Sequence, residues 1–132
     1  MSDDGLVRVT EGELAEDRFS RFRLIQWWDQ AKIAQTKVLV VGAGALGNEI
    51  VKNLALLGFS KVVIVDMDRI EHPNLSRSVL YRGGDVGCRK ADVAARAASE
   101  IYPGMVAWPV NANIVHGVGL GAVVDLADPA GL

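Results

Sequence analysis

The chain has 132 residues, half of them hydrophobic and 23% charged, a balance typical of a globular protein with one hydrophobic core and too short for two. Its formal net charge of −2, from 14 basic and 16 acidic residues, offers no overall attraction to nucleic acid or to an anionic membrane, and we expect neither as a partner. A single cysteine excludes an internal disulfide and a cysteine-rich zinc cluster.

The first 12 residues are polar and acidic, the opposite of a secretory signal, and we interpret them as a flexible lead-in to one domain over 13–132. No apolar run approaches the roughly 20 residues that span a bilayer, so we expect a cytoplasmic protein. From Glu13 to about Gln35, apolar residues recur at helical intervals, which predicts one long or broken amphipathic helix. Trp27 and Trp28 are neighbours there, so at most one of them can face the core squarely.

Short apolar runs then alternate with helical segments. Val38–Val41 predicts a strand, ALGNEIVKNLALL a helix that ends at Gly58, and KVVIVD a second strand that ends at Asp66. Residues 67–86 predict a long loop with one short helical turn, followed by an Ala-rich helix over about Cys88–Ile101 and a third strand in MVAWPVNA. This order is typical of a Rossmann-like α/β fold, a parallel β-α-β-α-β sheet behind a leading helix.

The remaining residues are too few for the second half of a doubly wound sheet. A parallel crossover takes about a dozen residues, and the glycines after the third strand oppose a helix. The segment AVVD offers a fourth strand. We therefore expect a truncated fold, either a fragment or a sheet that a partner completes. Because an unpaired strand edge promotes association, we also predict a homodimer or larger assembly.

The sequence GAGALG places three glycines at the spacing of a nucleotide-binding turn. Gly42 permits the tight turn, Gly44 lets the backbone approach a phosphate, and Gly47 lets the following helix pack closely. A purely structural turn is the alternative, since 14 glycines produce this spacing by chance in some chains. Asp66, 19 positions after Gly47, ends the second strand and would accept hydrogen bonds from ribose hydroxyls. NAD and ATP fit these features equally.

The charge of the loop after the second strand distinguishes between NAD and ATP as the ligand. Five basic residues lie between positions 69 and 90 and only two acidic ones, Glu71 and Asp85, oppose them. A triphosphate attacked at its α-phosphate needs more fixed cations than the pyrophosphate of a dinucleotide, because charge builds on the leaving pyrophosphate. This excess of basic residues therefore favours ATP. The alternative is that they form a solvated basic face. The basic residues are Arg69, Arg77, Arg82, Arg89 and Lys90.

Four motifs in this order, GAGALG, DMD, NLSR and GCRK, resemble the ThiF/MoeB/HesA family, relatives of the ubiquitin-activating enzymes. The segment RFSR resembles the arginine arm that precedes the nucleotide fold in that family. The resemblance covers roughly residues 17–113. It implies an ATP-dependent adenylyltransferase that uses Mg²⁺ and activates the C-terminal glycine carboxylate of a ubiquitin-like or sulfur-carrier protein ending in Gly-Gly.

The resemblance also implies roles for individual residues. Arg77, Lys90 and Arg21 would be catalytic, with Arg21 reaching across a homodimer to the partner's triphosphate. Asp66 would hold the ribose, and Asp68 would shape the site or the magnesium shell. The implied nucleotide-binding residues are Gly42, Gly44, Ala45, Gly47, Asp66, Asp68, Asn74, Arg77 and Lys90.

The end of the chain departs from the family. The family carries D-x-x-D-N after its fourth strand, with the second Asp as a magnesium ligand. Here VVDLADP supplies Asp128 at that position, and Pro129 replaces the Asn. Two other functions fit parts of the pattern: an NAD-binding oxidoreductase domain, and a non-catalytic interaction module that has lost turnover through truncation.

Overall fold

The computed structural model describes residues 17–116, so the expected lead-in over 1–12, the fourth strand in AVVD and Asp128 lie outside the described residues. Nine elements follow one another in that range. They are η2 (Phe22–Leu24), α2 (Gln30–Gln35), β1 (Lys37–Val41), α3 (Ala45–Leu57), β2 (Lys61–Val65), η3 (His72–Ser76), η4 (Gly83–Asp85), α4 (Lys90–Ile101) and β3 (Val106–Val110), where η marks a 3-10 helix.

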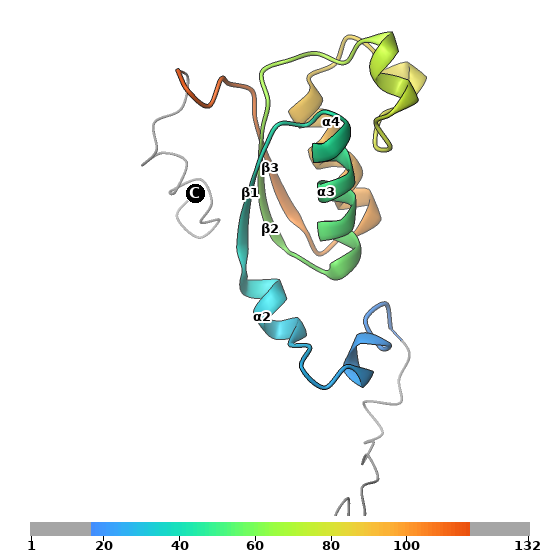
Figure 1. Cartoon of the computed structure of the whole chain (residues 1–132), viewed down its shortest axis with the longest axis vertical. Helices are drawn as coiled ribbons and strands as arrows, with labels where there is room; N and C mark the ends of the chain where they lie inside the picture. The colour runs from blue at the N-terminus through green and yellow to red at the C-terminus, as the bar shows by residue number, and fades with distance from the viewer. Residues whose placement is uncertain (1–16, 117–132) are drawn as a thin grey trace, which may run out of the picture.

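The three strands form one parallel sheet in the order β1-β2-β3. The pairing Val41↔Val65 and Val65↔Val110 brings their carboxyl ends level, so the segments that follow the strands meet at one edge. Helices α3 and α4 lie on the same face of the sheet (Figure 1), as expected when two right-handed crossovers proceed in one direction. The Rossmann-like parallel fold predicted from the sequence is confirmed. Between residues 17 and 116, no helix has the length and apolar character to cross a membrane.

The core lies between the sheet and these two helices. Val62 and Ile64 of β2 are at most 1% exposed and point toward α3 and α4. Four alanines of α4 are buried, and their small side chains let this helix approach the sheet closely. The buried alanines are Ala91, Ala94, Ala95 and Ala98. Within the described part of the chain, β1 and β3 are edge strands, and Pro109 lies on one of them, where a missing N–H is tolerated.

The leading segment is broken, which decides between the two forms predicted for it. One 3-10 turn ends at Ile25, whose backbone is extended, and α2 begins again after Asp29. The Asp29 carboxylate accepts a hydrogen bond from the Lys32 N–H at 3.0 Å, which caps the new helix. Trp28 is half-buried whereas Trp27 is 80% exposed, so only one of the two tryptophans packs inward.

This segment is attached where α3 and α4 end. Gln30 Nε2 donates to the Leu57 carbonyl at 2.8 Å, and Arg18 Nη1 donates to the Ile101 carbonyl at 2.9 Å. Both acceptors are terminal helix carbonyls, which have no partner within their own helix. The leading segment therefore lies at the amino ends of the strands, opposite the loops that follow them (Figure 1).

The loop between β2 and α4 holds two short 3-10 turns, where the sequence predicted one. Asp85 anchors the second: its Oδ2 accepts from the Arg82 N–H at 2.7 Å and its Oδ1 from Arg96 Nη2 at 2.8 Å. The Arg82 N–H and then the Arg96 guanidinium hold the pKa of the Asp85 carboxyl below its usual range. The carboxylate form of Asp85 therefore stabilises the folded chain.

We expect Asp85→Asn to lower the free energy of unfolding at pH 7 by about 1–2 kcal/mol. A pKa depressed in the folded state stabilises above the unfolded pKa, and this stabilisation disappears as the pH falls through the folded value. Urea unfolding at pH 7 and at about pH 3 would measure the difference between the variant and the wild type. Glu100→Gln, at an exposed position 3.9 Å from Arg96, is the control. A destabilisation by Asp85→Asn that is equal at both pH values would contradict the assignment.

Candidate functional site

The glycine turn follows β1 directly, and its three glycines meet different demands. Gly42 has a φ of 96°, in the left-handed region that favours glycine. A Cβ on Gly47 would lie 2.0 Å from the Gly42 carbonyl oxygen, so only glycine fits there. A Cβ on Gly44 would meet nothing within 4 Å. Two glycines are thus required by the fold, and the third faces open space at the amino end of α3.

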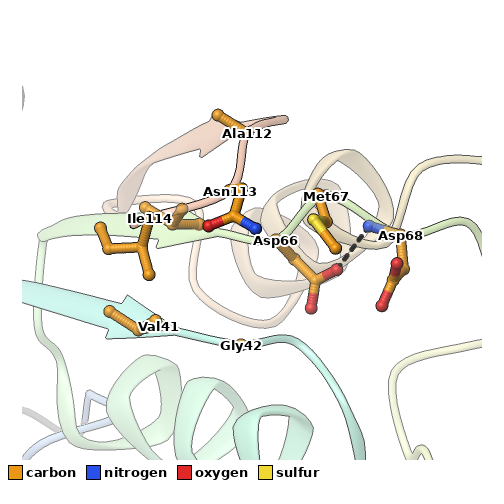
Figure 2. A pocket seen from close by; sticks show the side chains of 9 residues that line it. Val41, Gly42, Asp66, Met67, Asp68, Ala112, Asn113 and Ile114 are labelled. Atoms are coloured by element: carbon orange, nitrogen blue, oxygen red, sulfur yellow. Dashed lines mark hydrogen bonds between the residues drawn. The ribbon is translucent and has the colours of Figure 1, made fainter. Parts of the chain in front are cut away.

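Asp66 ties this turn to the end of β2. Its Oδ2 accepts from the Ala43 N–H at 2.7 Å. Its Oδ1 accepts from the Asp68 N–H at 2.7 Å (Figure 2). An ionised carboxylate has about four acceptor positions, so two remain after these bonds. Asp66 can therefore brace the turn and still accept hydrogen bonds from a ligand.

A hollow of about 190 Å³ opens beside Asp66 at the carboxyl edge of the sheet. Val41 and Gly42 form one side, Asp66 and Asp68 another, and Asn113 and its neighbours in the segment after β3 line the third (Figure 2). Open parallel sheets bind their ligands at this edge.

A second hollow of about 230 Å³ shares Asp68 with the first. Arg69, Glu71, Asn74 and Lys90 line the rest of it. Each hollow is smaller than the roughly 300–1,000 Å³ of a typical ligand pocket, so neither alone encloses a ligand of nucleotide size. Asn74 Oδ1 accepts from the Glu71 N–H at 2.8 Å, which holds the amide at this position.

The arginines of the basic loop bond mainly to the loop itself. Arg69 donates to the Gly87 carbonyl at 2.8 Å, and Arg89 donates to the Met67 carbonyl at 3.1 Å. Arg82 likewise donates to the carbonyls of Val79 and Tyr81. These guanidinium groups brace the loop, a use that the charge count did not reveal.

Lys90 differs from these arginines. Within residues 17–116, its ammonium group has no hydrogen-bond or ion-pair partner, and the side chain lines the second hollow. Its backbone N–H donates to the Asp68 carbonyl at 3.0 Å, which places the start of α4 beside the site.

Arg77 and Arg21 do not join this group. Arg77 Nη1 donates to the Pro73 carbonyl at 3.1 Å, and the side chain lines a different hollow with Glu49. Arg21 lies on the leading segment, at the opposite edge of the sheet from Asp66 (Figure 1). The structure therefore brings together the glycine turn, Asp66, Asp68, Asn74 and Lys90, and leaves the two arginines apart.

Two buried polar residues behind the turn, Asn48 and Tyr81, were not predicted as site residues. Asn48 is 0% exposed although it lies in α3, and Tyr81 is 3% exposed. Both bond to the Ala43 carbonyl oxygen. Asn48 could have been noticed as an amide within an apolar helix, but one of its partners, the Leu80 N–H, is 32 positions away in the sequence.

A parallel sheet with a glycine turn and an acidic residue at the next strand end defines a nucleotide-binding class of α/β fold. The chain belongs to the ThiF family, whose model matches residues 17–127. Crystal structures of E. coli MccB show the same architecture. MccB with ATP has a TM-score of 0.70 and 31% identity over 79% of this chain and 33% of MccB. MccB with AMPCPP and MccA has a TM-score of 0.71 and 28% identity over 80% and 34%.

Curated relatives include subunits of activating enzymes. The NEDD8-activating enzyme E1 catalytic subunit of Caenorhabditis elegans is 54% identical over 63 residues, which are 48% of this chain and 15% of that protein. Its counterpart in Drosophila melanogaster is 43% identical over 95 residues, 70% of this chain and 20% of that protein. The chain thus spans about a fifth or less of these relatives and about a third of MccB.

Proposed function

We propose that this chain is the nucleotide-binding part of an ATP-dependent adenylating enzyme that activates a terminal carboxylate of a ubiquitin-like protein, sulfur carrier or peptide. One observation carries the proposal: the hollow beside Asp66 and the glycine turn shares Asp68 with a second hollow, which is lined by Lys90 and Asn74. A ribose would lie against Asp66, and the phosphates would lie toward Lys90. The similarity to MccB solved with ATP supports the same choice of nucleotide.

The reaction would join a carboxylate oxygen to the α-phosphorus and break the bond from that phosphorus to the bridging oxygen, so pyrophosphate leaves. The carboxylate is already ionised at neutral pH and needs no general base. Its approach to a phosphate is a meeting of two anions, and fixed cations and donors lower that barrier. Lys90, the Asn74 amide and the backbone N–H groups at the start of α3 would supply them. Arg77, which lines a different hollow, is kept as a proposed phosphate contact on the basis of the family resemblance alone.

Mg²⁺ fits this site as a partner of the nucleotide. Between residues 17 and 116, no cluster of three or more His, Cys, Asp or Glu side chains could hold a metal ion alone. Mg²⁺ commonly binds through one or two carboxylates together with phosphate oxygens and water. Asp68, at the junction of the hollows, and Asp128 would provide carboxylates. When bound, the ion would neutralise charge on the phosphates.

The proposal includes a second copy of the chain. Arg21 lies at the edge of the sheet opposite Asp66, so it would act on the nucleotide of a partner subunit and not on its own. Apolar surface on the β1 side supports an assembly, with Val41 56% exposed and Leu46 75% exposed. The protein substrate is proposed from the names of the activating-enzyme relatives and from MccB solved with MccA.

We expect calorimetric titration of the full chain to show tighter binding of Mg·ATP than of NAD by roughly tenfold or more, the worth of one charge-assisted hydrogen bond. Pyrophosphate exchange that requires an added carrier protein would then separate an enzyme from a non-catalytic module. Tighter binding of NAD, or no binding of either nucleotide, would contradict the proposal.

A further inference from the structure

Asn48 connects the glycine turn to a distant loop through three hydrogen bonds. Its Nδ2 donates to the carbonyl oxygens of Ala43 at 2.9 Å and Gly44 at 2.8 Å. Its Oδ1 accepts from the Leu80 N–H at 3.0 Å. The side chain is fully buried, so water does not replace any of these partners. One amide thus joins the first turn of α3 to the loop that leads to α4.

Tyr81 bonds to the same carbonyl. Its hydroxyl donates to the Ala43 oxygen and lies 3.3 Å from the carbonyl oxygen of Lys90. Burial raises the pKa of the Tyr81 hydroxyl to about 12, so it keeps its proton at neutral pH. The Ala43 oxygen therefore receives two donors, one for each lone pair.

These two donors fix the direction of the peptide unit between Ala43 and Gly44. The peptide bond is trans, so the Gly44 N–H points away from the Ala43 carbonyl. Because that carbonyl points toward two buried side chains, the Gly44 N–H points outward at the amino end of α3. Among the described residues, none accepts a hydrogen bond from this N–H. The Ala43 N–H is bonded to Asp66, which holds the preceding peptide unit as well.

We propose that Asn48 and Tyr81 are positioning residues of the nucleotide site: they hold the Ala43 carbonyl inward so that the Gly44 N–H faces the phosphates. This inference rests on the function proposed above. The same contacts also join the glycine turn to the start of α4, because Tyr81 follows the bonded Leu80 and its hydroxyl lies 3.3 Å from the Lys90 carbonyl oxygen. A change at either side chain therefore acts on phosphate binding through the backbone.

The test compares a nucleotide that carries phosphates with a nucleoside that carries none. The full-length chain, its Tyr81→Phe and Asn48→Ala variants, and two controls are titrated with ADP and with adenosine by NMR. Tyr102→Phe and Asn53→Ala are the matched controls; Tyr102 lies at the far end of α4 and Asn53 is exposed on α3. Thermal unfolding of each variant checks that the measured population is folded.

We expect Tyr81→Phe to weaken ADP binding roughly fivefold, the worth of about one hydrogen bond, and Asn48→Ala to weaken it more, with adenosine affinity unchanged. The Gly44 amide resonance should shift on ADP addition in the wild type and respond less in both variants. Equal losses for ADP and adenosine, or wild-type ADP binding by a folded Tyr81→Phe chain, would overturn the inference alone. A wild type that binds neither ligand would overturn the proposed function with it.

Discussion

Gly47→Ala is expected to cost more than about 3 kcal/mol of folding free energy and to leave the chain largely unfolded at 37 °C. The added Cβ would lie 2.0 Å from the Gly42 carbonyl oxygen and 2.9 Å from its carbon. Neither atom can move away freely, because the Gly42 N–H donates to the Val65 carbonyl at 2.8 Å and holds the turn against β2. Urea unfolding followed by circular dichroism would measure the loss.

Gly44→Ala is the matched control for this prediction. A Cβ at Gly44 meets nothing within 4 Å, and its φ of −80° suits any residue. We expect its stability to stay within about 1 kcal/mol of the wild type. The same methyl group would stand where the backbone is proposed to approach phosphate, so ADP affinity should fall. If Gly47→Ala were as stable as Gly44→Ala, α3 would not pack on the turn as closely as the structure shows.

Lys90→Ala is expected to raise the Kd for Mg·ATP by roughly 10- to 100-fold, since a charge-assisted hydrogen bond contributes about 1.5–3 kcal/mol. Lys90 lines the hollow next to Asp68, and no described residue forms a hydrogen bond or ion pair with its ammonium group. Alanine is a good helix former at the first position of α4, so the fold should persist. Calorimetric titration at fixed ionic strength would measure the change.

Two comparisons make the Lys90 result specific. Lys32→Ala removes a lysine from α2, at the opposite edge of the sheet, and should leave ATP affinity within about twofold. Adenosine affinity should be the same in Lys90→Ala and in the wild type, since adenosine carries no phosphate. A uniform loss for ATP and adenosine, or an equal effect of Lys32→Ala, would show that Lys90 does not contact the phosphates.

Local signals in the sequence were sufficient for the sheet and its helices. The helix predicted for ALGNEIVKNLALL occurs as α3, Ala45–Leu57, because a glycine turn begins it and Gly58, at a φ of 90°, ends it. The three strands occur within a residue or two of the predicted runs, since short β-branched runs between turns are typical of buried parallel strands. The sequence does not predict whether the leading helix breaks before Asp29, because cap geometry and not hydrophobic periodicity decides this.

For the site, the sequence by itself determined which residues lie at the carboxyl edge: the glycine turn after β1 and Asp66 after β2. Strand order and parallel direction bring such residues together whatever the surrounding contacts are. Only the tertiary structure decided how the basic residues are used, with Arg69 and Arg89 bonded to loop carbonyls and Lys90 directed into a hollow. Only the tertiary structure also brought Asn48 to Leu80 and Tyr81 to Ala43. These bonds join residues 32 and 38 positions apart, and no local propensity or period encodes such a pairing.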